Sequence, residues 1–280
     1  MDVSPIKKSV RGFLKYFVIF LFLPDCVYSI GNYPVGARSL AISHASVSFS
    51  DVWAAFHNQA GLAGVTNLSS GFFYESKFQV DELSLVSGSL VLPTGSGNFG
   101  LSFFQFGKGN FRENKLGLAF SKQLTAKFSA GIQLDYLSQT FPENSRSKGF
   151  VTFEGGVIYS ISEGLILGAH VFNPLNAGIE TLTGKQKIPA VFRLGGQYHF
   201  DEMAMVVFEA EKDTENPLLL KTGIEFLPVE NLVLRFGVSG KPFKYTAGLG
   251  YTFGKVTTDI GFSYHGNLGV TPSVSLQFEW

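Results

Sequence analysis

The sequence predicts an all-β protein: an antiparallel transmembrane β-barrel of about fourteen strands with a short N-terminal helical plug. From Leu68 to the C-terminus, apolar residues alternate with small or polar ones at a period of two, as strands with two different faces require. Aromatic residues make up 15% of the chain and charged residues only 16%, whereas soluble domains carry about 25% charged residues. The chain therefore needs a surface that tolerates apolar side chains.

The clearest alternation lies in Pro242–Gly254. One face carries Phe243, Tyr245, Ala247, Leu249, Tyr251 and Phe253, and the other carries Lys244, Thr246, Gly248, Gly250 and Thr252. Lipid offers no hydrogen-bonding partners, so strands cross a membrane only as a closed barrel without edges. We expect the first face to contact lipid and the second to face the lumen.

Similar runs of roughly ten residues, the length that a tilted strand needs to cross a bilayer, recur along the chain. They lie near 68–78, 81–93, 97–107, 112–122, 125–138, 149–161, 164–173, 188–200, 202–211, 216–227, 231–240, 242–254, 255–265 and 270–280. In the second run, Leu83 and Leu85 fall on the opposite face from the later leucines, which a bulge near Ser87–Ser89 would explain.

Many connections between these runs alternate in length, and outer-membrane barrels have short periplasmic turns and longer outer loops. The long, polar linkers are Gly107–Phe111, Gln139–Lys148 and Asn173–Lys187. They fall on one side if the first strand rises from the periplasm. Two linkers predicted on that side are short, so the pattern is only partly satisfied. The expected location is the outer membrane of a Gram-negative cell, with both barrel ends periplasmic.

The chain ends on an alternating strand with a terminal aromatic residue. Leu276, Phe278 and Trp280 form its apolar face, which resembles the C-terminal signal read by the outer-membrane barrel-assembly machinery. We therefore expect that machinery and outer-membrane lipid as partners.

The N-terminus has the pattern of a signal peptide. Basic residues precede the apolar run Tyr16–Leu23, which is too short to span a membrane as a helix. We place the cleavage after Ser29, so that 1–29 is the signal peptide. The alternative is a lipoprotein with an acylated Cys26, although Asp25 is a poor residue before a lipidated cysteine.

The residues predicted to face the lumen include charged groups of both signs. They are Glu154, His170, Arg193, His199, Glu209, Arg235, Lys244 and Asp259, with Lys221 and Glu225 on the same faces. Mixed signs favour ion pairs over a pore selective for one charge. No metal-ligand spacing, nucleophile motif or phosphate-binding loop occurs, so we predict no catalytic residue, no metal and no cofactor. The equal numbers of acidic and basic residues argue against nucleic acid.

Residues 30–66 do not alternate and precede the barrel domain at 67–280. This segment is rich in Ala, Ser and Gly, and Ser50 or Asp51 is suited to cap one short helix over Val52–His57. We expect it to plug the barrel mouth. The plug residues singled out are Arg38, Asp51, Trp53, Phe56, Asn58, Gly61 and Leu62.

Three parts of this segment form a recognisable pattern: Ala37–Ala41, Asp51 and Asn58–Ala63. The pattern resembles the N-terminal signature of the PorV/PorQ family, which is itself similar to FadL-type transporters. Ile42–His44 replaces a glycine-rich part of that signature, and Gln59 replaces a proline. The resemblance implies an outer-membrane barrel with an N-terminal hatch, of the kind found in Bacteroidetes.

Two functions follow from the resemblance. PorV/PorQ-like proteins imply an accessory role in secretion or surface assembly of the type IX kind, with secretion-system proteins as partners. FadL-like proteins imply instead a passive transporter of small hydrophobic compounds, which the phenylalanine-rich run Phe99–Phe106 also favours. A general polar pore is a third, weaker interpretation.

Overall fold

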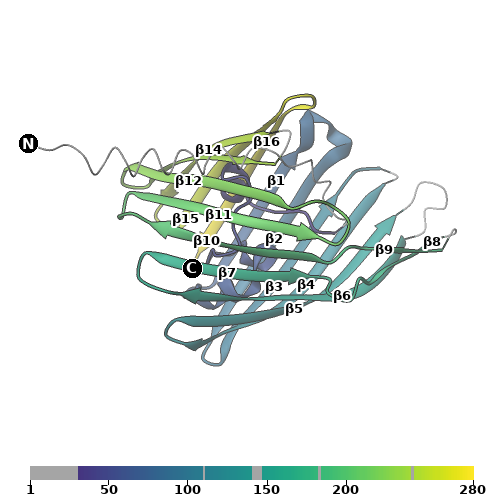
Figure 1. Cartoon of the computed structure of the whole chain (residues 1–280), viewed down its shortest axis with the longest axis horizontal. Helices are drawn as coiled ribbons and strands as arrows, with labels where there is room; N and C mark the ends of the chain where they lie inside the picture. Colours follow the sequence, from purple (N-terminus) through teal and green to yellow (C-terminus); the bar gives the residue numbers. More distant parts are fainter. Residues whose placement is uncertain (1–30, 110, 141–146, 182–183, 241–242) are drawn as a thin grey trace, which may run out of the picture.

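The chain forms a closed antiparallel β-barrel of fourteen strands (Figure 1). The computed structural model describes residues 31–280 apart from 110, 141–146, 182–183 and 241–242. The predicted cleavage after Ser29 and the alternative lipidation at Cys26 lie outside the described residues. The fold class and the strand number predicted from the alternating pattern are confirmed.

The barrel strands match the predicted ranges to within a few residues. They are β1 (Ser69–Ser76), β2 (Ser84–Thr94), β3 (Gly97–Phe106), β4 (Arg112–Thr125), β5 (Phe128–Thr140), β6 (Ser147–Ser160), β7 (Leu165–Phe172), β10 (Val191–His199), β11 (Ala204–Asp213), β12 (Leu219–Val229), β13 (Leu232–Ser239), β14 (Lys244–Phe253), β15 (Val256–His265) and β16 (Gly269–Glu279). Each pairs with its neighbours in chain order, and β16 closes the ring on β1.

The remaining elements are short. Before the barrel lie α2 (Ala37–Ala41), α3 (Ala54–His57) and the 3-10 helix η2 (Gln59–Gly64). Two further 3-10 turns, η3 (Lys77–Gln79) and η4 (Asp81–Leu83), connect β1 to β2, and a separate hairpin of β8 (Gly178–Thr181) and β9 (Gly184–Lys187) lies between β7 and β10. Within the described residues, no helix is long and apolar enough to cross a membrane.

The two faces of the strands separate as the alternation predicts. On β14, Tyr245, Leu249, Tyr251 and Phe253 are exposed on the outside, while Thr246 is buried. The outward faces of the other strands carry the same kind of apolar side chain, and this produces the lipid-facing surface that a membrane barrel needs. The barrel is therefore an outer-membrane protein.

The predicted bulge near Ser87–Ser89 is wrong. The pairing of β2 with both β1 and β3 is continuous through this region. Leu83 belongs to η4 rather than to the strand, and Leu85 points inward, where it is fully buried in an apolar cluster. The register instead shifts between Gln123 and Thr125 and between Phe226 and Val229.

The lengths of the connections orient the barrel. At the end that holds Ser69 and Trp280, the turns span two to four residues, whereas at the other end the connections reach eighteen residues, between Phe172 and Val191. The first connection at that end, Lys77–Leu83, is longer than the sequence predicted because β1 stops at Ser76. The short-turn end is periplasmic by the rule for such barrels, and the other is called the outer end below.

We predict that Leu249→Arg destabilises the barrel by about 2–4 kcal/mol, because the charge would lie near the middle of the lipid-facing surface. The matched change Thr252→Arg should cost less, since Thr252 lies on the inward face near the periplasmic turn. Urea unfolding followed by heat-modifiable gel mobility measures both. Equal midpoints for the two variants would contradict the assignment of the faces.

Candidate functional site

The segment 31–66, called the plug from here on, lies inside the ring of strands (Figure 1). Its first helix, α2, packs against β13, β14, β15 and β16, and η2 packs against β3, β4, β5 and β6 on the other side. The segment between them also contacts the wall, because Val47 lies against Gly168 of β7. The plug therefore extends across the lumen.

Inward-facing glycines of the barrel wall, called the glycine belt from here on, leave space for the plug. On ten strands, a glycine stands where an added Cβ would come within 3.0 Å of a plug atom. The belt consists of Gly71, Gly100, Gly131, Gly156, Gly168, Gly195, Gly223, Gly237, Gly248 and Gly261. A Cβ added to Gly131 would lie 2.4 Å from the carbonyl carbon of Gln59 and 2.6 Å from the backbone nitrogen of Ala60. The plug thus touches the bare backbone of the wall.

Amide side chains join the plug to the wall where no regular sheet connects them. Asn58 donates from Nδ2 to the carbonyl oxygens of Val47, Val157 and Ala169 at 2.7, 3.1 and 3.3 Å, and its Oδ1 accepts from the amide of Ala60. Asn98 of β3 donates to the carbonyls of Leu62 and Val65. These bonds give partners to backbone carbonyls of the plug and of β6 and β7, where unpaired buried groups would be costly.

Arg38 of α2 anchors a first cluster of charges, which is partly buried. Its guanidinium forms two parallel bonds to the carboxylate of Glu225, at 2.7 and 2.8 Å, and a third to Asp51 at 3.3 Å. The guanidinium of Arg235 donates to the same Glu225 through Nε and to Asp259 through Nη1, each at 2.7 Å. Although burial opposes its charge, Glu225 raises the pKa of Arg38. This cluster links the plug to β12, β13 and β15.

A second cluster is centred on Glu209 of β11. Its Oε2 accepts the amides of Ser46 and Val47 at 2.9 Å each, while Oε1 lies 2.9 Å from Lys221 Nζ. Lys221 and Arg193 both pair with Glu211. Glu209 thus accepts hydrogen bonds from two plug amides and from the Lys221 ammonium, and these charge-assisted bonds hold the plug backbone against β11.

The second cluster continues across β10, β7, β6 and β4. Arg193 lies 3.5 Å from His170 Nδ1, and His170 Nε2 lies 3.2 Å from Glu154 Oε2. Glu154 also pairs with Lys115, whose ammonium lies 3.4 Å from Asp135. Charges of both signs thus form ion pairs on β10–β12 and on β4–β6, and the imidazole of His170 lies between these two groups.

The apolar residues singled out in the plug lie in one buried cluster. Trp53, Phe56 and Leu62 pack together with residues of β1, β2, β3 and β4. Trp53 fits against Gly36 and Gly71 and makes an edge contact with Phe73, with ring centroids 6.3 Å apart. A Cβ on Gly61 would lie 2.0 Å from the carbonyl oxygen of Phe49, so only glycine fits there.

The helix predicted over Val52–His57 is shorter, at Ala54–His57, because residues 51–53 form a turn. Asp51 nevertheless acts near its start, since Oδ1 accepts the amide of Trp53 at 2.9 Å. Burial raises the pKa of Asp51, and Arg38 opposes this rise. The helix α2 was not predicted at all, because five residues give too little periodicity to detect.

Two of the predicted lumen residues lie outside the ion-pair clusters described above. His199 is exposed at the periplasmic end of β10 and contacts Gln197, and Lys244 is partly exposed at the outer end of β14. Sequence reasoning missed Lys115, Asp135 and Asn98. All three lie on the inward face of a predicted strand, so the alternation itself contained the signal that marks them.

An open space of about 570 Å³, called the outer cavity from here on, lies between the plug and the barrel wall. The plug contributes Tyr33, Pro34, Leu40 and His44, and the wall contributes η3 and the outer ends of β1, β14, β15 and β16. Apolar side chains there stand beside Lys77, Lys244 and Glu75. The cavity therefore suits a small, mainly apolar molecule.

The plug backbone is strained at His44, which lines the outer cavity, and at Ser43 before it. Ser43 and His44 have φ angles of 58° and 60°, in the left-handed region that favours glycine. They stand where the PorV/PorQ-like signature has its glycine-rich part. Ser43 bonds Thr246 through its amide, and Ser39 Oγ lies 3.2 Å from His44 Nδ1. Burial, with Lys221 nearby, lowers the pKa of His44, so its imidazole is neutral.

The opposite side of the outer mouth is filled by side chains. Ile179 of the β8–β9 hairpin and Ile188 are buried against Leu137, Phe172 and Val191. Asn173 holds this loop, because Nδ2 donates to the carbonyls of Ala177 and Ile188 at 3.1 and 2.7 Å. Among the described residues, this side of the mouth is packed, whereas the outer cavity lies on the β14–β16 side.

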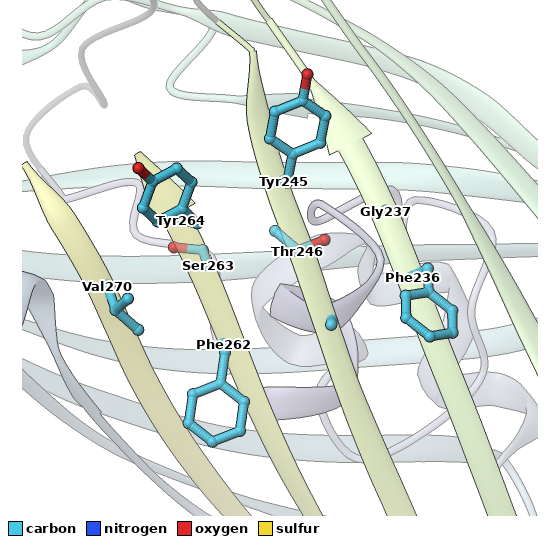
Figure 2. Close-up of a pocket in the computed structure, with 9 residues that line it drawn as sticks. Phe236, Gly237, Tyr245, Thr246, Phe262, Ser263, Tyr264 and Val270 are labelled. Carbon is cyan, nitrogen blue, oxygen red and sulfur yellow. The ribbon is translucent and has the colours of Figure 1, made fainter. Parts of the chain in front are cut away.

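The wall beside the outer cavity is also hollowed from outside. A groove of about 410 Å³ lies between Phe236, Tyr245, Phe262 and Tyr264. Figure 2 shows these side chains with the plug behind the strands. Ala247 leaves the groove open because its side chain is small. The pairings of β13 with β14 and of β14 with β15 are continuous here, so no gap between strands joins the groove to the lumen.

Comparisons with known proteins agree on the fold. No protein-family model and no curated protein matches the chain. Among solved structures, the toluene transporter TodX of P. putida matches with a TM-score of 0.65 at 15% identity, covering 88% of this chain and 98% of that chain.

Two further structures match over similar lengths. The toluene transporter TbuX of Ralstonia pickettii has a TM-score of 0.69 at 12% identity, covering 88% of this chain and 98% of that chain. A FadL homologue of Pseudomonas aeruginosa has a TM-score of 0.64 at 14% identity, covering 90% and 99%. The chain therefore has the fold of FadL-type barrels, whereas none of these comparisons supports the PorV/PorQ assignment.

We expect Gly131→Ala to destabilise the folded barrel by about 1–3 kcal/mol, because its Cβ would overlap plug backbone that cannot rotate away. The control is Gly266→Ala, where no atom lies within 4 Å of the added Cβ. Urea midpoints for the two variants provide the measurement. An unchanged midpoint for Gly131→Ala would show that the plug does not rest on the wall there.

We predict that the stability of the folded barrel depends on pH because the plug buries His57. Burial lowers the pKa of His57 to about 3, and its Nε2 lies 2.7 Å from the carbonyl oxygen of Val35. Below about pH 6.5, the unfolded chain binds a proton that the folded chain excludes, so stability falls as the pH drops from 6.5 towards 3. At pH 4.5, the loss from His57 should be roughly 2–3 kcal/mol.

Urea unfolding at pH 7 and pH 4.5 tests this dependence. His57→Gln, which keeps a donor for Val35, should lose less stability on acidification than the unmodified protein. His199→Gln, at an exposed position, serves as the control and should behave like the unmodified protein. The same pH dependence in all three proteins would contradict the prediction.

Proposed function

We propose that the protein is a passive outer-membrane transporter of small hydrophobic compounds. The observation that carries the proposal is the outer cavity, a space of about 570 Å³ in the outer half of the lumen. Apolar side chains of Leu40, Phe78 and Leu268 form much of its lining. The structural similarity to toluene transporters and to a FadL homologue supports the same class of function.

The plug determines what such transport requires. A molecule in the outer cavity contacts the plug at Tyr33, Leu40 and His44. Beyond these residues, the plug rests on bare wall backbone and is held by Arg38 and by Glu209. Passage to the periplasm therefore requires the plug to shift. His44, which lines the cavity, has a left-handed backbone like Ser43 before it, so a bound molecule would contact the plug at a strained position.

The accessory role in type IX-like secretion remains a prediction from the N-terminal signature. Recovery of secretion-system proteins after crosslinking in native membranes would favour it. We do not propose an enzymatic activity.

Uptake measurements test the transport proposal. Cells that lack the protein should take up radiolabelled toluene or oleate at least fivefold more slowly than cells that express it. Ser263→Phe places a ring in the outer cavity and should reduce uptake to a similar extent. The matched control Tyr264→Phe lies on the outward face of the same strand and should leave uptake unchanged. If deleting the protein changes the uptake of neither compound, the proposal is wrong.

A further inference from the structure

A second space, called the periplasmic pocket from here on, lies between the plug and the periplasmic ends of β1 and β16. Its volume is about 120 Å³, and most of its lining is polar. The lining includes Ser50, Asp51, Val52, Asn67, Ser69 and Gln277. The outer cavity touches the same two strands nearer the outer end, at Glu75 and Thr271. The two spaces therefore lie at opposite ends of the wall that β1 and β16 form.

The inward side chains of this wall between the two spaces are mostly small. On β16 they are Ser273 and Ser275, and on β1 they are Gly71 and Phe73. Three of these four residues fill little of the lumen. The plug therefore supplies most of the atoms that keep the outer cavity and the periplasmic pocket apart.

The indole of Trp53 lies between the two spaces. A Cβ on Gly71 of β1 would lie 2.8 Å from Trp53 Cη2, and a Cβ on Gly36 of the plug would lie 3.2 Å from Trp53 Cγ. The indole thus extends from the plug backbone to the bare backbone of β1. Val52, the residue before it, lines the periplasmic pocket, whereas Pro34, two residues before Gly36, lines the outer cavity. A molecule that passed from one space to the other along this wall would meet the indole.

A buried polar atom favours movement of this indole. Trp53 Nε1 is buried, yet it has no hydrogen-bond partner among the described residues. An unpaired buried donor is costly. The lining of the periplasmic pocket offers acceptor oxygens on Asp51, Asn67 and Gln277. Rotation of the indole towards the pocket would exchange the unpaired donor for a bonded one, and this gain offsets part of the packing that the rotation loses.

We propose that small hydrophobic molecules pass from the outer cavity to the periplasmic pocket along β1 and β16, and that the Trp53 side chain closes this route. The inference rests on the transport function proposed above, and it adds the path and the residue that obstructs it. The shift of the plug that transport requires is then local. The bonds of the plug to Glu225 and Glu209 lie on β12 and β11, away from this path, and need not break.

Uptake by cells tests the route. Trp53→Ala should raise the protein-dependent uptake of radiolabelled toluene at least threefold, because the side chain that separates the two spaces is removed. Protein-dependent uptake is the excess over cells that lack the protein. The matched control is Phe104→Ala, which removes a buried aromatic side chain of the same apolar cluster, but on β3 rather than on β1 or β16. It should leave uptake unchanged.

The two possible failures of this uptake experiment are distinguishable. If cells with and without the protein take up toluene equally fast, the transport function is wrong and the route is wrong with it. If the protein speeds uptake but Trp53→Ala and Phe104→Ala behave alike, transport stands and the route is overturned.

Fluorescence of the purified protein keeps the route testable even if Trp53→Ala does not fold. The chain has two tryptophans, so Trp280→Phe leaves only the emission of Trp53. Acrylamide should quench this emission weakly, because Trp53 is 1% exposed. Toluene that enters the route displaces the indole towards the pocket, so it should raise the quenching constant at least twofold.

The matched variant Trp53→Phe reports the exposed Trp280 instead, and its quenching should not depend on toluene. Quenching of Trp53 that toluene leaves unchanged, or an equal effect of toluene on Trp53 and Trp280, would overturn the route.

Discussion

The plug can occupy the lumen only where the inner surface of the wall is bare backbone, and this constraint organises the molecule. A fourteen-stranded ring leaves a lumen that cannot hold both a layer of large side chains and a second chain segment. On ten strands, the inward residue that contacts the plug is a glycine, so no side chain competes with the plug for space there. Above and below the glycines, the same strands carry large buried side chains on the inward face, such as Phe104 and Arg235. The plug thus explains where the inward glycines stand, whereas contact with lipid explains the apolar outer surface.

Close contact with bare backbone leaves polar groups that need partners, and the buried side chains supply them. Asn58 and Asn98 satisfy carbonyls in the plug, and Glu209 accepts two of its amides. Within the two ion-pair clusters, each arginine and lysine contacts two carboxylates. Such pairs add little net stability over an apolar core, but breaking one is costly because it leaves a buried charge uncompensated. We infer that they fix one position of the plug.

Charge and strain are distributed unevenly around the plug. Bonds to the carboxylates of Glu225 and Glu209 join it to β12 and β11, whereas apolar packing of Trp53 and Leu62 holds it on the β1–β4 side. The outer cavity and the left-handed residues Ser43 and His44 lie between these regions. A segment that shifts during transport would move most easily there, since that part of the plug borders empty space rather than packed atoms.

The alternating pattern alone determined the barrel, its strand number and its two faces, because lipid outside and a polar interior impose opposite demands on neighbouring residues. The pattern gave the wrong face for Leu85. Inward positions are usually polar, but Leu85 points inward because it packs in the apolar cluster that includes plug residues. The same pattern marked Glu154, Arg193, Glu209, Arg235 and Asp259 as inward residues, yet it did not indicate their partners.

Only the tertiary structure decided those pairings, because they join residues on different strands and depend on register and on the path of the plug. The same holds for the contact of Arg38 with Glu225, 187 positions apart in the chain. It also holds for the outer cavity, a space that no single segment defines. The sequence specified what each face must tolerate, and closure of the ring around the plug determined which residues meet.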